Sequence, residues 1–299
     1  MEENLALVAR LRAAGCVFAE DEAELLSSAA RSPAELDALV ERRATGEPLE
    51  QVVGWAEFAG LRILVDPGVF VPRRRSEFLI QVAVALVRRH RVLTSPAASV
   101  STVSPATSVP TAVATVIVDL CCGTGALGLA VAAEIGVGLG GIMPGAIELH
   151  SADLDPAAVA CARLNVEPAG GRVYAGDLFD PLPPTLRGRV SLLICNAPYV
   201  PSAEIAFLPA EARDHESLAA LDGGSDGLSV LRRAASEAPG WLADGGVLLV
   251  ETSDRQAAEM ASVMASAGLV ARVHADEEYG ATVVTGTAHD SGRELLEHS

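Results

Sequence analysis

The sequence has few basic and few aromatic residues. Its 299 residues include 22 Lys and Arg against 39 Asp and Glu, a net charge of -17, and aromatic residues make up 4%. An acidic field of this size repels phosphate backbones, so general binding to nucleic acid is disfavoured unless basic groups gather locally. One such cluster exists, at Arg73, Arg74 and Arg75.

Signals for export and for membrane insertion are also missing. The chain starts with the acidic residues Glu2 and Glu3, and no apolar segment with a small-residue cleavage site follows. The most apolar window, residues 126–143, contains Glu134 and many glycines, so we expect a buried helix followed by a loop there. The five cysteines form no CxxC pair, which favours reduced thiols. We therefore expect a cytoplasmic protein with no membrane partner.

The first third of the chain predicts a helical domain and a hairpin. Residues 1–45 have helical periodicity, and Ser32 followed by Pro33 and Glu35 is a typical helix start. We assign residues 1–50 to a small helical domain. Short alternating apolar stretches with Gly60 as a turn residue then predict a β-hairpin linker over residues 51–75.

The remainder, residues 76–299, predicts an α/β domain. A helix is expected from about residue 77 to 91 with Ser76 as its cap, and the Ser/Thr/Pro/Ala-rich residues 94–114 predict a flexible surface insertion. Strands are predicted at residues 115–120, 147–153, 172–176, 190–196 and 245–251. Helices between most of them indicate a parallel, doubly wound sheet. The segments 270–276 and 281–288 leave no room for a helix, so we expect an antiparallel pair at one edge.

A glycine-rich turn follows the first of these strands. Gly123, Gly125 and Gly128 form G-x-G-x-x-G between a strand and a helix, where the backbone can approach a ligand. The turn alone does not distinguish a nicotinamide cofactor from S-adenosylmethionine.

Three aspartates near strand ends favour S-adenosylmethionine. Asp119 precedes the glycines, where a carboxylate suits the ammonium and sulfonium side of that cofactor. Asp153 ends the second strand and is placed to accept hydrogen bonds from ribose hydroxyls. Asp177 follows the third strand, where it would accept from the adenine amino group or serve only as a turn residue.

The segment "NAPY" after the fourth strand suggests methyl transfer to a planar nitrogen. The lone pair of an amide or aromatic amine is delocalised, so the site must hold and polarise that nitrogen close to the methyl group. The side-chain oxygen of Asn196 and the carbonyl of Ala197 would each accept one N–H of the acceptor, which stabilises positive charge on nitrogen. Pro198 would fix the turn, and Tyr199 would pack on the acceptor or exclude water.

Several further segments share their sequence with one family. They include "RRATGEPLEQVVGWAEFAGLRILVDPGVFVPRRRSE", "ADLDP", "GDLFDPL", "NAPYVP", "EARDHESLAALDGGSDGL" and "WLADGGVLLVETSDRQA", spread over residues from about 40 to 287. With these segments the chain resembles the protein-(glutamine-N5) methyltransferases of the HemK/PrmC type, which methylate a glutamine amide in peptide chain release factors. Most of the segments lie outside the cofactor motif, so the resemblance is more specific than one to methyltransferases in general.

The resemblance implies a fold, a reaction and a set of site residues. The fold would be a seven-stranded, Rossmann-like, class I S-adenosylmethionine-dependent methyltransferase sheet, preceded by a helical domain that recognises the substrate. The partner would be a release factor, and we expect a monomer without a metal. The cofactor-binding residues would be Asp119, Cys121, Gly123, Thr124, Gly125, Asp153, Leu154, Asp177, Leu178 and Asn196. The catalytic and substrate-binding residues would be Asn196, Ala197, Pro198 and Tyr199, with Arg73 as a further substrate contact.

The sequence departs from the family pattern at three places. Ala197 replaces the first of two prolines between the asparagine and the tyrosine. The segment Arg73-Arg74-Arg75-Ser76 replaces Arg-Pro-Glu/Asp-Thr, which puts a base where the family has an acid. Ser217 follows Glu216 where the family has a proline. These departures indicate a divergent branch and leave open the same chemistry on a different protein.

Three other functions remain as alternatives. A methyltransferase acting on an exocyclic amino group of a nucleic-acid base uses a similar Asn-x-Pro-Tyr element, but base flipping also needs phosphate contacts and stacking residues. A nicotinamide oxidoreductase would leave the Asn196 segment unexplained. A binding module that has lost catalysis would bind cofactor without turnover.

Overall fold

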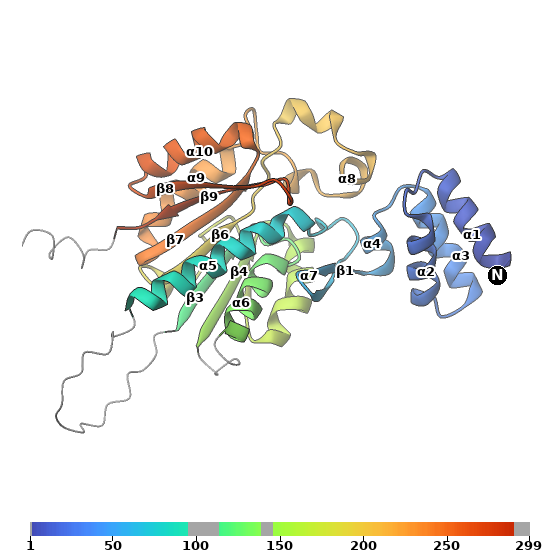
Figure 1. Ribbon diagram of the computed structural model, residues 1–299, viewed down its shortest axis with the longest axis horizontal. Helices are drawn as coiled ribbons and strands as arrows, with labels where there is room; N and C mark the ends of the chain where they lie inside the picture. Colours follow the sequence, from blue (N-terminus) through green and yellow to red (C-terminus); the bar gives the residue numbers. More distant parts are fainter. Residues whose placement is uncertain (1, 95–113, 139–145, 290–299) are drawn as a thin grey trace, which may run out of the picture.

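The computed structural model describes residues 2–94, 114–138 and 146–289 (Figure 1). The insertion predicted at residues 94–114 lies, apart from its two end residues, outside the described residues. None of the helices in the described ranges has the length and apolar character that crossing a bilayer requires.

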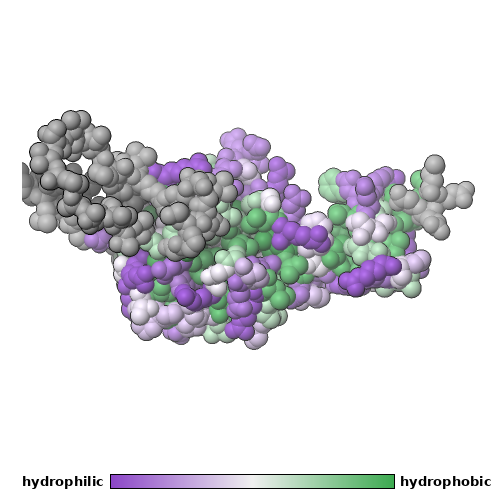
Figure 2. Space-filling view, turned by 90° about the horizontal axis from the view of Figure 1, so that it is seen from below, coloured by the Kyte–Doolittle hydropathy of each residue, from purple (hydrophilic) through white to green (hydrophobic). Residues whose placement is uncertain are grey.

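The N-terminal unit is a group of helices with a core of its own. Its helices are α1 (Glu2–Ala13), α2 (Ala19–Ala29), α3 (Pro33–Ala44) and α4 (Leu49–Val53). Leu11, Leu26 and Val40 pack in this core. The predicted start of α3 is confirmed, because the Ser32 hydroxyl accepts a hydrogen bond from the Glu35 N–H over 3.2 Å. Figure 2 shows this unit as a lobe beside the larger body.

A short hairpin connects the N-terminal unit to the sheet. Strands β1 (Trp55–Phe58) and β2 (Leu61–Leu64) pair in antiparallel register. The first residues of the predicted hairpin segment, 51–53, instead belong to α4, which ends where Gly54 adopts a φ of 82°. A left-handed glycine at this position stops the helix and turns the chain into β1. The Asn165 side chain bonds the N–H and the carbonyl of Leu64, which fixes the hairpin against the body.

The body contains a seven-stranded sheet in the order β5-β4-β3-β6-β7-β9-β8. Its strands are β3 (Thr115–Leu120), β4 (Ile147–Asp153), β5 (Arg172–Ala175), β6 (Val190–Cys195), β7 (Leu242–Thr252), β8 (Val270–Asp276) and β9 (Ala281–Thr287). The first five are parallel, whereas β9 pairs with β7 and β8 in antiparallel register. The predicted doubly wound sheet and its antiparallel edge are therefore confirmed.

Helices cover both faces of the sheet (Figure 1). One face carries α5 (Glu77–Thr94), α6 (Ala126–Gly138) and α7 (Pro156–Val166), and the other carries α9 (Ser229–Glu237) and α10 (Asp254–Ser266). Side chains alternate along β3 between the two layers: Val116 and Val118 pack toward α9 and α10, whereas Ile117 packs toward α5 and α6. Burial on both faces is the reason that β3 is apolar almost throughout.

Shorter helices complete the body. They are η1 (Arg74–Ser76), η2 (Glu167–Ala169), η3 (Pro184–Leu186), η4 (Ser202–Phe207), α8 (Ala210–His215), η5 (Leu218–Ala220) and η6 (Ala238–Gly240). Residues 202–221, which include η4, α8 and η5, form a segment that we call the cover. The cover lies beyond the carboxyl ends of the parallel strands, on the side of the N-terminal unit (Figure 1).

Candidate active site

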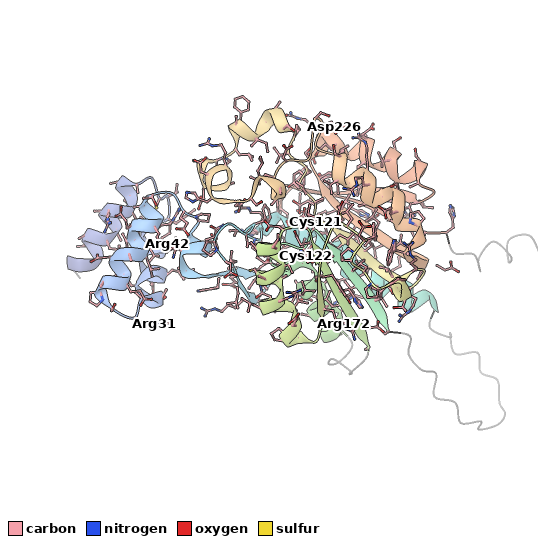
Figure 3. The ribbon with its side chains drawn as sticks, turned by 180° about the vertical axis from the view of Figure 1, so that it is seen from behind. Arg31, Arg42, Cys121, Cys122, Arg172 and Asp226 are labelled. Carbon is pink, nitrogen blue, oxygen red and sulfur yellow. The ribbon has the colours of Figure 1, made fainter. Side chains whose placement is uncertain are left out.

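A cavity of about 610 Å³ lies at the carboxyl ends of β3, β4 and β6 and under the cover. Parallel sheets place their ligands at this end, and the volume is in the range of small-molecule sites. In Figure 3, the labelled Cys121 and Cys122 lie in the middle of the molecule, at the end of the sheet that faces the N-terminal unit. The cavity has a cofactor end beside these residues and an acceptor end beside Asn196, Arg75 and the cover.

The glycine turn between β3 and α6 forms one wall of the cofactor end. Cys121, Gly123 and Gly125 have φ angles of 53°, 55° and 78°, so three residues of a five-residue stretch are left-handed. Cys121, Gly123 and Thr124 line the cavity, whereas Gly125 does not. A Cβ on Gly125 would lie 2.5 Å from Val166 Cγ2, which shows that this glycine serves the contact between the turn and α7.

Asp119 has a different place from the predicted one. The sequence predicts a carboxylate that faces the cofactor, but Asp119 is 1% exposed and is not part of the cavity wall. Its Oδ2 accepts a hydrogen bond of 3.0 Å from the Gly128 N–H. Burial raises the pKa of this carboxyl to about 7, with a smaller contribution from the Asp153 charge. Asp119 therefore holds the start of α6 in place behind the glycine turn.

Asp153 lines the cofactor end where β4 stops. Its Oδ2 accepts from the Gly123 N–H over 2.8 Å, and its Oδ1 accepts from the Asp155 N–H over 2.9 Å. Burial raises the pKa of Asp153, and these N–H groups oppose the shift. The side chain is thus fixed between the glycine turn and α7, in the position predicted for a ribose contact.

Asp177 lies on the wall further out. It is part of the cavity lining, and its Oδ2 accepts a hydrogen bond of 2.7 Å from Arg233. Leu154 and Leu178 line the same end, Leu154 66% exposed and Leu178 buried with a φ of 46°.

The cofactor end has the groups that an adenosyl cofactor requires. The half-buried carboxylate Asp153 suits ribose hydroxyls, the apolar Leu154 and Leu178 suit the faces of a planar base, and the left-handed turn exposes backbone beside them. S-adenosylmethionine therefore fits these residues.

The segment Asn196–Tyr199 lines the cavity at the end of β6, next to the end of β3 from which the glycine turn starts. All four residues line the cavity, and Ala197 is 2% exposed. The Asn196 Nδ2 donates to the Ser76 Oγ over 3.4 Å, so this bond leaves its Oδ1 as the acceptor atom. Among the described residues, no side chain or backbone group donates to Asn196 Oδ1 or to the Ala197 carbonyl. Two acceptor oxygens are therefore available side by side.

Tyr199 is held by a buried charge. Its hydroxyl donates to Glu251 Oε1 over 2.9 Å, and the Arg75 Nε lies 3.1 Å from the same oxygen. The Arg75 guanidinium also lies over the Tyr199 ring, 5.4 Å from its centroid. Burial, followed by the Glu251 charge, raises the pKa of the Tyr199 hydroxyl, so the hydroxyl stays neutral and donates. On the other side, Gln256 Nε2 donates to the Tyr199 carbonyl over 2.9 Å.

Arg73 also lines the cavity, but its guanidinium is already paired. It forms an ion pair with Glu216, whose side chain is fully buried and also accepts from the Val71 N–H. The Arg73 guanidinium lies 5.0 Å from the centroid of the Phe70 ring. Arg73 thus fastens the cover to the segment that precedes α5.

The N-terminal unit contacts the cover through two side chains. Arg43 on α3 bonds Glu22 over 2.6 Å and Glu211 on α8 over 3.3 Å. Gln51 donates to the carbonyls of Val69 and His215. The position of the cover therefore depends on α3 and α4 as well as on the sheet.

Sequence reasoning missed several residues of the acceptor end. Ser76, predicted as a helix cap, lies in η1 and bonds Asn196. Glu251 and Gln256 were not predicted as site residues, although Glu251 is a charged residue at the end of an apolar strand. A charge at the end of an apolar strand is the sequence signal that could have pointed to Glu251.

Comparisons with known proteins agree with this geometry. No protein-family model matches the chain. A release factor glutamine methyltransferase from Geobacter sulfurreducens is 34% identical over 260 residues, which cover 85% of this chain and 79% of that protein. A 4-amino-L-phenylalanine/4-methylamino-L-phenylalanine methyltransferase from Streptomyces pristinaespiralis is 33% identical over 77% of this chain and 69% of that protein.

Among solved structures, the catalytic domain of hMettl16 in complex with a hairpin of the MAT2A 3′ untranslated region has the same fold. It aligns with a TM-score of 0.54 at 11% identity, covering 85% of this chain and 83% of that chain. The fold and the cofactor end define a class I S-adenosylmethionine-dependent methyltransferase. More narrowly, the chain belongs to the release factor glutamine methyltransferase family.

Proposed function

We propose that this methyltransferase methylates the side-chain amide nitrogen of a glutamine in a peptide chain release factor. The observation that carries the proposal is the pair of acceptor oxygens, Asn196 Oδ1 and the Ala197 carbonyl, in residues that line the same cavity as the glycine turn. A primary amide has two N–H groups, and this pair receives both. The relative from Geobacter sulfurreducens, named for the same reaction, supports it.

The residues act mainly by position and by charge. When bound, S-adenosylmethionine would supply a methyl group from its positively charged sulfur and leave as S-adenosylhomocysteine, while the acceptor nitrogen would release one proton. Asn196 and Ala197 orient the amide so that its nitrogen faces that methyl group, and their oxygens stabilise the positive charge that develops on nitrogen. Tyr199, fixed by Glu251 and Gln256, closes one side of the cavity against water. Asp153, with Cys121, Gly123, Thr124, Leu154, Asp177 and Leu178, holds the cofactor.

The N-terminal unit, residues 1–50, recognises the protein substrate. Its contact with the cover through Arg43, together with the bond from Gln51 at the start of the connection to the His215 carbonyl, brings it close to the cavity. A protein loop that enters the cavity would bring the rest of the substrate against this unit. The intervening residues 51–75 serve as the connection to the methyltransferase domain.

Methylation of a nucleic-acid base is less well supported. The arginine cluster that would have to hold phosphates is largely neutralised, because Arg73 pairs with Glu216 and Arg75 with Glu251. The net charge of -17 also opposes binding to a phosphate backbone.

A second candidate is N-methylation of a free aromatic amino acid. The relative from Streptomyces pristinaespiralis is named for 4-amino-L-phenylalanine, and an aryl amine also has two N–H groups for the same pair of oxygens. Phe58, Phe70 and Tyr199 line the cavity and suit an aromatic acceptor.

Transfer of a radiolabelled methyl group to a purified release factor tests the proposal. We expect label on the wild-type factor, none on a factor whose loop glutamine is changed to alanine, and transfer about 10²- to 10³-fold slower with the Asn196→Ala enzyme. Cofactor binding by that variant, measured by calorimetry, separates a catalytic defect from misfolding. Label on 4-amino-L-phenylalanine but not on the release factor would contradict the proposal and favour the second candidate.

A further inference from the structure

The three consecutive arginines before α5 have different surroundings. Arg74 is exposed and is not part of the cavity wall, whereas Arg73 and Arg75 both line it. Arg73 is tied to Glu216 and stacked over Phe70. The Arg75 side chain remains 47% exposed, although its Nε lies beside Glu251. Arg75 is therefore the more accessible cation of the acceptor end.

The carboxylates that balance these arginines lie beneath them. The side chains of Glu216 and Glu251 are 0% and 2% exposed, against 33% for Arg73 and 47% for Arg75. An acceptor that enters the cavity consequently meets the guanidinium groups and not the carboxylates. Each pair is neutral as a whole, and its guanidinium is the more exposed partner.

The acidic residues of the wall lie elsewhere. Asp153, Asp155 and Asp177 belong to the cofactor end. Glu211 lines the cavity from the cover, and its carboxylate bonds Arg43 of the N-terminal unit. None of these acids is paired with Arg75.

Arg75 is also close to the group that holds the methylated nitrogen. It precedes Ser76, whose hydroxyl accepts from Asn196 Nδ2, and its guanidinium lies over the ring of Tyr199. A guanidinium is planar and binds a carboxylate through two parallel hydrogen bonds, which makes such a contact selective as well as attractive.

We propose that Arg75 selects acceptors that carry a carboxylate in addition to the methylated nitrogen. This inference rests on the proposed methyl transfer at Asn196, and it narrows the acceptor to one with an acidic neighbour. The carboxylate has two sources: an aspartate or glutamate beside the target glutamine in a protein loop, or the α-carboxylate of a free amino acid.

Matched pairs of acceptors test the inference. The first pair consists of a peptide with aspartate next to the target glutamine and the same peptide with asparagine at that position. This pair is made twice, with the varied residue before the glutamine and after it. The other pair is 4-amino-L-phenylalanine and 4-(2-aminoethyl)aniline, which lacks the carboxylate. Each pair is compared by kcat/KM and by binding to enzyme loaded with S-adenosylhomocysteine, a measurement that needs no turnover.

We expect the wild-type enzyme to prefer the carboxylate member of at least one pair by about tenfold or more, the size of a charge-assisted hydrogen bond. The Arg75→Gln variant should lose this preference, and Arg75→Lys should keep part of it because the charge remains without the planar fork. Arg74→Gln, one residue away and outside the cavity wall, is the control and should keep the full preference. Melting temperature and cofactor affinity show whether each variant is folded.

The pair that shows the preference identifies the source. A preference among peptides supports a protein acceptor with an acidic neighbour. A preference confined to the aryl amines, with no methylated glutamine, supports selection by Arg75 but overturns the glutamine proposal. Equal binding and turnover within both pairs, or a preference that Arg75→Gln retains, overturns the inference itself, whether or not glutamine is the acceptor.

Discussion

The two ends of the cavity are held together by different kinds of interaction. At the cofactor end, backbone geometry and close packing dominate: the left-handed turn at Cys121–Gly125, the contact of Gly125 with Val166, and the N–H groups that bond Asp153. All of these lie in neighbouring βα units. At the acceptor end, Tyr199, Glu251 and Arg75 are joined through side chains from distant parts of the sequence. Changes at the cofactor end should therefore affect stability together with cofactor binding, and changes at the acceptor end should affect the acceptor alone.

A large loss of stability is expected from Gly125→Ala. The new Cβ would lie 2.5 Å from the buried side chain of Val166, at a φ of 78°. Gly170→Ala is a matched control, because Gly170 has a φ of 85° with nothing within 4 Å of the added atom. Both changes carry the left-handed strain, so their difference reports the clash, which we expect to cost about 2 kcal/mol. Urea unfolding gives the free energies of unfolding. If both variants lose the same free energy of unfolding, α7 moves away from the new methyl group without a cost in stability.

A change of stability with pH is expected from Asp119. Its pKa of about 7 in the folded protein lies above the ordinary value of 3.8, so the folded state keeps a proton that the unfolded state releases between these values. Its contribution to the free energy of unfolding therefore falls as pH rises from about 4 to about 7, and is constant above that range.

The variant Asp119→Asn keeps an oxygen for the Gly128 N–H but does not titrate. Relative to wild type, it should gain about 1 to 3 kcal/mol in free energy of unfolding between pH 5 and pH 8. Asp180→Asn, which changes an exposed carboxylate of the same domain, should track wild type. A constant difference between Asp119→Asn and wild type over this range would show that Asp119 does not bind the proton.

At the acceptor end, Tyr199→Phe removes one hydrogen bond and leaves the ring in place. The buried Glu251 loses a donor, and we expect kcat/KM for the acceptor to fall about fivefold to tenfold, the effect of one hydrogen bond of ordinary strength. Cofactor affinity should be unchanged. Tyr279→Phe is the control, because the Tyr279 hydroxyl bonds Gln81 at an exposed site. A comparable loss of cofactor affinity in Tyr199→Phe would erase the distinction between the two ends.

The smallest effect is expected from Glu211→Gln. This change breaks the ion pair between Arg43 and Glu211 of the cover. The Glu211 side chain is 44% exposed. We expect KM for a protein acceptor to rise about twofold to threefold, with kcat and cofactor affinity unchanged. Glu41→Gln, which breaks the pair with Arg10 inside the N-terminal unit, should leave KM unaltered. The same rise in KM in both variants would indicate a general charge effect.

Local patterns in the sequence predicted much of the fold. Strands were placed correctly at Thr115–Leu120, Ile147–Asp153 and Val270–Asp276 from apolar runs. The start of α3 was predicted from Ser32, whose hydroxyl accepts from the Glu35 N–H over 3.2 Å. The hairpin prediction was less accurate, because residues 51–53 are also compatible with the helical turn that Gly54 ends. In these cases the deciding interactions lie within a few residues of one another.

The cavity was only partly predictable. Residues at the carboxyl ends of predicted parallel strands, such as Asp153 and Asn196, do line it, because that rule depends only on strand direction. Asp119 also lies near the carboxyl end of a parallel strand, but its side chain points into the body. Because Gly128 has no side chain, the Asp119 carboxylate can pack directly against its backbone. No local pattern shows which of two acidic residues at strand ends faces the ligand.

The sequence by itself determined the strands, the caps, the glycine turn and the segment that accepts the substrate nitrogen. Only the tertiary structure decided that β7 lies beside β6, which brings Glu251 to Tyr199, and that the chain before α5 crosses the same end, which brings Arg75 to both. It also decided that Arg73 and Arg75 pair with buried carboxylates and line the cavity, whereas Arg74 does not line it. The physical reason is that the exposure and pairing of a charge depend on neighbours more than 50 residues away along the chain.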